Sequence, residues 1–103
     1  MRKMYYVSHP YTGDEEKNKK EAREITATLK NEYPAHIFIN PLDTFQYTEG
    51  WPYEKALKNC IELLGKCDGI IMTGDWEHSR GCKKEKEVAD QLDIEITELH
   101  EWL

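Results

Sequence analysis

The sequence predicts a three-layer α/β fold, in which a parallel sheet of about four or five strands carries helices on both faces. Short apolar runs alternate with amphipathic helical segments along the whole chain, and Gly, Pro and Asn residues separate them. No internal repeat or low-complexity segment interrupts this alternation. Strands that alternate with helices are joined by right-handed crossovers, which make the strands parallel and place helices on both sides.

The elements of the first half are two strands, one helix and one loop. In order they are a strand over residues 4–8, a helix capped by Asp14 over 14–31, a buried strand over 36–39 and a loop over 42–51. The helix places Ala22, Ile25 and Leu29 on one face and its lysines and glutamates elsewhere.

The second half begins with a helix whose first residue is Pro52 and whose end is marked by Gly65. One buried stripe of this helix is expected to hold Tyr53, Ala56, Leu57, Cys60, Ile61 and Leu64. The remaining elements are a strand over 69–73, a loop over 75–81, a helix over 81–92, a strand over 94–96 and a C-terminal helical turn.

The size and composition are typical of one globular domain, which we expect to span residues 1–103. Hydrophobic residues make up 39% of the chain and charged residues 33%, and no apolar run approaches the length of a membrane span. The N-terminal residues lack the apolar stretch of a signal peptide, so we expect a cytoplasmic protein that does not bind membranes. The net charge of −6 disfavours binding to a nucleic acid polymer, because a polyphosphate backbone needs a basic surface.

The cysteines and histidines give no sign of a metal site or of a disulfide framework. The three cysteines, Cys60, Cys67 and Cys82, are odd in number and widely spaced, so we expect reduced thiols. Neither they nor the four histidines have the close pairing that a zinc site requires. The sequence also lacks a P-loop and a G-x-G-x-x-G fingerprint. We therefore expect no metal and no cofactor.

The loops that follow the first three strands are the expected binding region, because ligands of open parallel sheets bind outside the carboxyl ends of the strands. The residues that we expect to contact a small-molecule ligand there are Ser8, Pro10, Tyr11, Gly13, Asn40, Trp76, Ser79, Arg80 and Gly81. The aromatic residues Tyr11, Trp51 and Trp76 could stack on a ring, although each could equally be a packing residue.

Glu85 is the most informative residue of the third helix. It shares a face with Cys82, Val88, Ala89 and Leu92, and it is the one charged residue on that face. A buried carboxylate is normally paired or used chemically, because burying it alone costs several kcal/mol. Glu85 could therefore support the helix terminus, pair with Arg80 or a lysine, or act in a site. Glu87 lies on the outer face of the same helix.

The start of this helix also has two interpretations. Ser79 is a good N-cap residue, whose side chain would simply satisfy a backbone amide. The segment Ser79, Arg80 and Gly81 would also leave amides exposed at a helix N-terminus, which is an anion site.

Five short motifs together resemble one known family over nearly the whole chain. They are P-x-T-G (10–13), I-N-P (39–41), W-P-Y (51–53), C-D-G-I-I (67–71) and G-D-W-E-x-S-x-G-x-x-x-E-x-x-x-A (74–89). In this order they resemble the small phage and prophage proteins related to nucleoside 2-deoxyribosyltransferases. The resemblance implies a Rossmann-like (flavodoxin-like) sheet, a nucleoside or nucleotide as the small-molecule partner, and a homo-oligomer.

The resemblance also implies roles for two residues. Glu85 follows Gly81 at the spacing of the family's nucleophilic glutamate, which attacks the anomeric carbon of the sugar. Ser79 matches the serine that helps to hold the 5′-phosphate in the nucleotide N-glycosidase branch. The implied reaction is cleavage or exchange of the N-glycosidic bond of a (deoxy)nucleoside or its 5′-monophosphate, through a covalent glycosyl intermediate.

One departure from the family leaves the activity open. The family usually has an aspartate near the leaving base eight residues before Asp68, and this chain has Cys60 there. A thiol is a poor general acid at neutral pH. A catalytically weak nucleotide-binding module, acting as a sensor or a sequestering protein, is therefore the alternative hypothesis. A plain protein-interaction domain is a third possibility, which an exposed apolar patch and a closed crevice would indicate.

Overall fold

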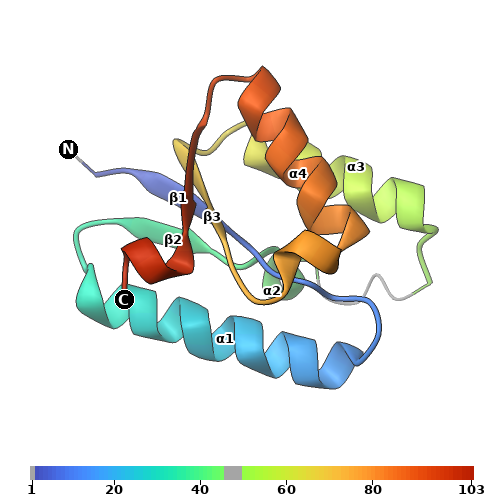
Figure 1. Cartoon of the computed structure of the whole chain (residues 1–103), viewed down its shortest axis with the longest axis horizontal. Coiled ribbons are helices and arrows are strands. Elements are labelled where there is room, and N and C mark those ends of the chain that lie inside the picture. Colours follow the sequence, from blue (N-terminus) through green and yellow to red (C-terminus); the bar gives the residue numbers. More distant parts are fainter. Residues whose placement is uncertain (1, 46–49) are drawn as a thin grey trace.

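A computed structural model, which describes residues 2–45 and 50–103, shows one parallel sheet of four strands between two layers of helices (Figure 1). The strands are β1 (Met4–Ser8), β2 (Ile37–Ile39), β3 (Gly69–Met72) and β4 (Glu95–Glu98), and their order in the sheet is β2-β1-β3-β4. Every neighbouring pair is parallel. The fold class predicted from the alternation of strands and helices is therefore confirmed.

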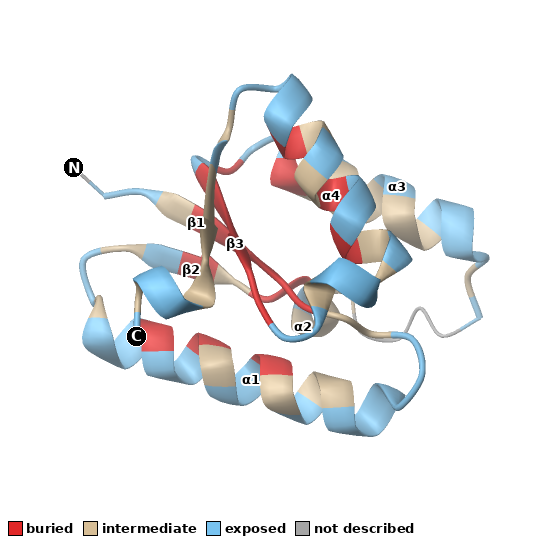
Figure 2. Ribbon diagram, viewed as in Figure 1, coloured by how far each residue is buried: buried red, intermediate tan, exposed pale blue. Residues whose placement is uncertain are grey.

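The two central strands form the core of the molecule. All four residues of β3 are buried, and so are the last four residues of β1, because helices cover both faces of these strands (Figure 2). Gly69 lies opposite Tyr5 in the register of β1 and β3. A Cβ atom at Gly69 would come within 2.7 Å of the Tyr5 ring, so only glycine lets this ring pack over β3.

Successive side chains of β1 point to opposite faces of the sheet, so the core has one part on each face. On one face, Tyr5 and Val7 pack with Leu29 of α1 (Glu15–Glu32). On the other face, Tyr6 packs with residues of α3 (Tyr53–Leu64) and α4 (Arg80–Gln91). Figure 1 shows α1 below the sheet and the pair α3 and α4 on the opposite side.

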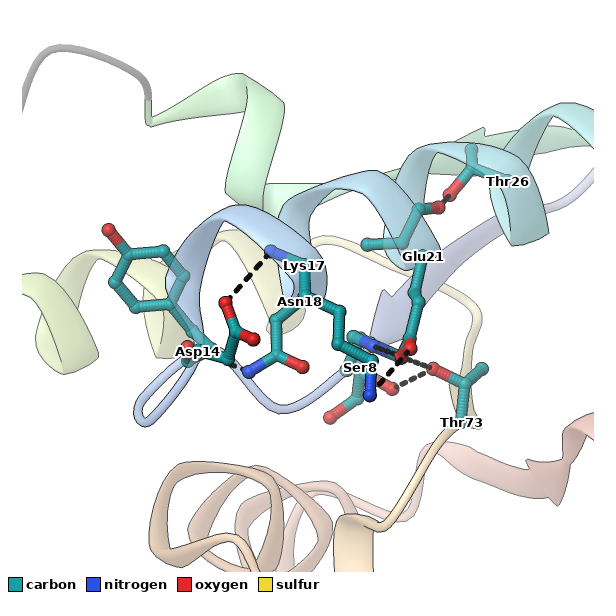
Figure 3. Close-up of polar contacts among 10 residues, drawn as sticks. Ser8, Asp14, Lys17, Asn18, Glu21, Thr26 and Thr73 are labelled. Atoms are coloured by element: carbon teal, nitrogen blue, oxygen red, sulfur yellow. Dashed lines mark hydrogen bonds and ion pairs between the residues drawn. The ribbon is translucent and has the colours of Figure 1, made fainter.

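The N-terminus of α1 is fixed as the sequence predicts. The Asp14 side chain accepts a hydrogen bond from the Lys17 amide at 3.4 Å and caps the helix (Figure 3). The Asn18 amide group donates to the Tyr11 carbonyl at 2.9 Å, which attaches the loop after β1 to the first turn of α1. This loop is therefore attached to α1 through Tyr11.

Several boundaries differ from those expected. Residues 41–44 form the short helix α2 (Pro41–Thr44) in place of a loop, because the Asn40 side chain accepts from the Leu42 amide at 3.1 Å and starts a helical turn. Trp76–His78 forms a 3₁₀ turn, η1, where a loop is expected. The C-terminal helical turn that the sequence predicts is observed as a second 3₁₀ turn, η2 (Leu99–Glu101). The strand expected over 94–96 is observed over 95–98. The expected loop over 42–51 includes residues 46–49, which lie outside the described residues.

Three expectations about burial are wrong. Within β2, which is expected to be buried, only Phe38 is fully buried, because β2 is an edge strand. Within the apolar stripe of α3, only Leu64 is buried, because the stripe extends past the sheet toward a cavity described below. Leu92 is 53% exposed, since it caps the C-terminus of α4 and lies beyond the sheet.

Candidate functional site

A cavity of about 310 Å³ opens at the carboxyl ends of the strands, and each of the three loops named above contributes to it. Its walls are mainly aromatic and aliphatic side chains, and Glu85 lies among them. The lining residues are Tyr6, His9, Tyr11, Thr12, Lys19, Pro41, Leu42, Phe45, Trp51, Tyr53, Ala56, Leu57, Cys60, Ser79, Gly81, Cys82 and Glu85. The cavity thus combines ring faces suited to stacking with one carboxyl group.

Glu85 is held in place by two hydroxyl groups from β1. The side chain is only 7% exposed, the Tyr6 phenol donates to its Oε2, and the Ser8 hydroxyl donates to its Oε1 at 2.8 Å. Burial raises the pKa of Glu85, and the two hydrogen bonds, which favour the charged form, act in the opposite direction. Among the described residues Glu85 makes no ion pair, and Arg80 lies instead 3.6 Å from Glu54.

Two further groups beside Glu85 keep their protons firmly. Burial raises the pKa of the Cys60 thiol to about 11, with the charge of Glu85 adding to the effect and the hydrogen bond with Tyr6 opposing it. Burial, followed by the charge of Glu85, raises the pKa of Tyr6 well above its ordinary value. Near neutral pH both groups are therefore neutral hydrogen-bonding partners.

His9, which lines the cavity, belongs to a network with Thr73 and Glu21, two residues that Figure 3 labels. The Thr73 hydroxyl donates to the Ser8 carbonyl at 2.8 Å, and its oxygen also lies 2.8 Å from His9 Nδ1. His9 Nε2 lies 3.2 Å from a carboxylate oxygen of Glu21 on α1. Burial, the largest cause, lowers the pKa of His9, and Glu21 partly offsets this. Both ring nitrogens of His9 thus lie within hydrogen-bond distance of side chains of the protein.

Gly74 makes room for this network. Its φ of +64° lies in the left-handed region, and a Cβ atom there would approach His9 Cε1 to 2.7 Å. The end of β3 can therefore turn beneath the His9 ring only with glycine at this position.

A second cavity of about 570 Å³ adjoins the first, and the two share Thr12, Tyr53, Ser79 and Gly81. Its other lining residues are Pro10, Gly13, Asn18, Asp75, His78 and Arg80. The hydrogen bond from His78 to Asp75, at 2.7 Å, is the main cause that raises the pKa of His78. Arg80 lies over the ring of Tyr53, with 4.9 Å to the ring centre. The second cavity is therefore the more polar of the two.

The first turn of α4 forms the boundary between the cavities. Ser79 caps the helix, since its hydroxyl accepts from the Cys82 amide at 3.2 Å. A Cβ atom at Gly81 would meet only the Tyr53 hydroxyl, at 3.7 Å, so packing within the chain does not require glycine there. The absent side chain leaves free space beside the first backbone amides of the helix, where an anion is favoured.

Seven of the ten residues expected from the sequence line one or both cavities: Pro10, Tyr11, Gly13, Ser79, Arg80, Gly81 and Glu85. The other three are placed differently. Ser8 lies beneath Glu85 and orients it, and Asn40 caps α2. Trp76 packs against the core and donates to Glu98 at 3.3 Å, which fits its interpretation as a packing residue.

Sequence reasoning did not identify Tyr6 or His9 as site residues. Tyr6 reads as a core residue of a buried strand, and its partner Glu85 is 79 residues away. His9 could have been noticed, because a histidine that directly follows a buried strand lies at the edge where ligands bind. Among the described residues, no group of three or more His, Cys, Asp or Glu side chains could hold a metal ion.

Residues 3–98 match the family model described as Domain of unknown function (DUF4406). The chain belongs to this family. No protein of curated function matches the sequence. Within the described residues, no helix is long and apolar enough to cross a membrane.

Two solved structures have the same fold. A 2-deoxyribosyltransferase from Bacillus psychrosaccharolyticus superposes with a TM-score of 0.70 at 17% identity, over 92% of this chain and 70% of that one. A 2-deoxyribosyltransferase from Leishmania mexicana superposes with a TM-score of 0.65 at 16% identity, over 93% of this chain and 63% of that one. The chain thus has a nucleoside 2-deoxyribosyltransferase-like fold, and it spans less than two thirds of the Leishmania protein.

Proposed function

We propose that this protein cleaves or exchanges the N-glycosidic bond of a nucleoside or its 5′-monophosphate, with Glu85 as the nucleophile. The observation that carries the proposal is the carboxyl group of Glu85, which is buried in an aromatic cavity and oriented by two hydroxyl donors. The two 2-deoxyribosyltransferases that share the fold support a substrate of the nucleoside class.

The proposed reaction follows from this geometry. A carboxylate oxygen of Glu85 attacks the anomeric carbon of the sugar, the bond to the base breaks, and a glycosyl ester forms. The Tyr6 and Ser8 hydroxyls fix both oxygens, so little reorientation is needed before attack. Water or a second base then takes the sugar from the ester, which regenerates the carboxylate.

The two cavities divide the substrate between them in this proposal. The first holds the base and the sugar, because its rings can stack on a base and its carboxyl group reaches the sugar. The second receives the 5′-phosphate at the N-terminus of α4, beside Ser79, Arg80 and Gly81. In this proposal Ser79 has both of the roles that the sequence allows, since a capping hydroxyl can also face an anion.

The test is base release from a panel of nucleosides and nucleotides by wild type and Glu85→Gln. Glutamine keeps the shape of the side chain but cannot form the ester, so release should fall about a thousandfold. The matched control is Glu87→Gln on the same helix, since Glu87 is exposed and lies 3.8 Å from Lys84. Its activity should stay within about threefold of wild type. Equal loss in both variants would contradict the proposal.

A nucleotide-binding module without turnover is the second candidate function, and the Cys60 thiol favours it. With its pKa raised to about 11, Cys60 cannot replace the acid that usually assists a departing base. Calorimetric binding of the same nucleotides distinguishes the two functions, since tight binding without base release would establish the module. The homo-oligomer implied by the family resemblance stays a prediction, which sedimentation analysis would check.

A further inference from the structure

The walls around Glu85 contain no side chain suited to protonate a departing base, among the residues that the structure describes. Among the described residues that line the first cavity, Glu85 is the one with a carboxyl group, and it accepts hydrogen bonds from Tyr6 and Ser8. His9 directs both ring nitrogens to Thr73 and Glu21. The other titratable lining groups are phenols, thiols and one ammonium. Side chains of these classes are weak acids, which give up a proton less readily than a carboxylic acid does.

The lack of such an acid among the described lining residues restricts the bases that can leave. A purine or pyrimidine departs as an anion unless an acid protonates it, and such an acid typically contributes a factor of about 10² to 10⁴ in rate. A base that already carries a positive charge, such as a pyridinium or an N-alkylated purine, departs as a neutral molecule. It takes the electron pair of the glycosidic bond and needs no proton.

The walls of the cavity are also suited to a flat cation. Three lining rings already have a basic side chain over one face. The distances to the ring centres are 5.8 Å from Lys19 to Tyr11, 4.1 Å from Lys55 to Trp51 and 4.9 Å from Arg80 to Tyr53. Aromatic faces attract cations electrostatically, and a charged aromatic base can stack on them as well.

Glu85 and a cationic base would stabilise each other. Burial penalises the charged form of Glu85, and a positive ring beside the carboxylate offsets that penalty. The substrate itself would thus favour the ionised nucleophile. Two of these basic side chains have acidic neighbours, since Lys19 lies 4.0 Å from Glu16 and Arg80 lies 3.6 Å from Glu54.

We propose, on the basis of the glycosidic cleavage proposed above, that the substrates are 5′-phosphorylated glycosides of positively charged bases, with nicotinamide mononucleotide as the simplest probe. Glu85 attacks the anomeric carbon and forms the ester as the carbon–nitrogen bond breaks. The electron pair of that bond neutralises the pyridinium, and neutral nicotinamide leaves. Water then hydrolyses the ester to ribose 5-phosphate and restores the carboxylate with release of one proton.

The experiment compares rate enhancements, so that the intrinsic lability of each compound cancels. The enzymatic release of nicotinamide from nicotinamide mononucleotide and of uracil from uridine monophosphate is divided by the uncatalysed rate of each compound. The enhancement for the charged base should exceed that for uracil by about a hundredfold or more, the scale of a missing acid. Reduced nicotinamide mononucleotide, which has nearly the same shape without the charge, should bind at least tenfold more weakly.

A variant that supplies an acid tests whether its absence causes the preference for charged bases. Cys60 lines the cavity beside Tyr6 and Glu85, so Cys60→Asp would supply an acid there and should narrow the ratio of the two enhancements at least tenfold. Cys60→Ser, which supplies none, should leave the ratio unchanged. Equal enhancements in wild type, or a bell-shaped pH profile with uridine monophosphate, would overturn this inference and leave the proposed function standing. Release from neither compound would overturn both.

Discussion

Replacement of Tyr6 by Phe tests how the protein keeps a buried carboxylate reactive. The Tyr6 side chain is fully buried, and its phenol is one of two donors to Glu85. Phenylalanine keeps the ring and removes only the hydroxyl, which also forms a hydrogen bond with Cys60. Because the hydrogen bond favours the charged form of Glu85, its loss makes ionisation of the nucleophile harder.

The expected size of the shift in the pH profile follows from the energy of a hydrogen bond to a charged group, about 1.5 to 3 kcal/mol. Since 1.36 kcal/mol corresponds to one pH unit, the acidic limb of the kcat/KM profile should move to higher pH by about one to two pH units. The assay is base release measured over a pH series. Well above the limb, the variant should approach the wild-type rate.

Tyr5→Phe is the matched control, because Tyr5 neighbours Tyr6 on β1 and points to the opposite face among Phe38 and Trp102. The pH profile of kcat/KM for Tyr5→Phe should match that of wild type. An acidic limb that stays in place in Tyr6→Phe, or moves to lower pH, would refute the assignment of Tyr6 as a donor that stabilises ionised Glu85.

Three other predictions follow from the structure. Gly74→Ala should lower the free energy of unfolding by about 2 kcal/mol or more in urea titrations, from left-handed strain and contact with His9, whereas Gly50→Ala, with open space around it, should change it little. Ser79→Ala should weaken a nucleoside monophosphate by about 1 kcal/mol in calorimetry while sparing the nucleoside, and equal weakening of both would count against a phosphate contact. The raised pKa of Glu85 contributes stability that is present below its ordinary value of 4.5 and is lost as the pH rises through the raised value. As the pH rises through that window, the free energy of unfolding of wild type should therefore fall relative to that of Glu85→Gln. A difference between the two proteins that does not change with pH would contradict this.

Local signals in the sequence predicted the elements well. The β-branched and aromatic run over residues 4–8 predicted β1 with its observed bounds, and Asp14 and Ser79 predicted two helix starts, because capping depends on residues only three positions apart. Periodicity also placed Glu85 on the inner face of α4. These features are encoded within a few residues of where they appear.

Features that depend on where the sheet ends were not predictable in the same way. Leu92 has the spacing of a buried residue, but α4 has passed the sheet at that point. Trp76 lies in a loop expected to bind ligand, yet its ring packs on the core and its indole nitrogen donates to Glu98. Periodicity describes the face of an element and not what covers that face.

The two networks that define the site join residues far apart in the chain. Tyr6 meets Glu85 across 79 positions, and His9 meets Thr73 across 64. A single sequence contains no signal for such pairs, because each residue alone has an ordinary core or turn interpretation. The register of β1 beside β3 brings His9 to Thr73, and the packing of α4 against Tyr6 of β1 brings Glu85 to Tyr6.

The most direct test of the account is to trap the covalent intermediate on Glu85. A 2′-fluorinated analogue of a cleaved nucleotide slows hydrolysis of the ester, so that intact-mass and peptide mass spectrometry can detect it. The account predicts one sugar phosphate attached to the peptide that contains Glu85, and no adduct in Glu85→Gln. Base release by wild type without any adduct, or an adduct on another residue, would contradict the account.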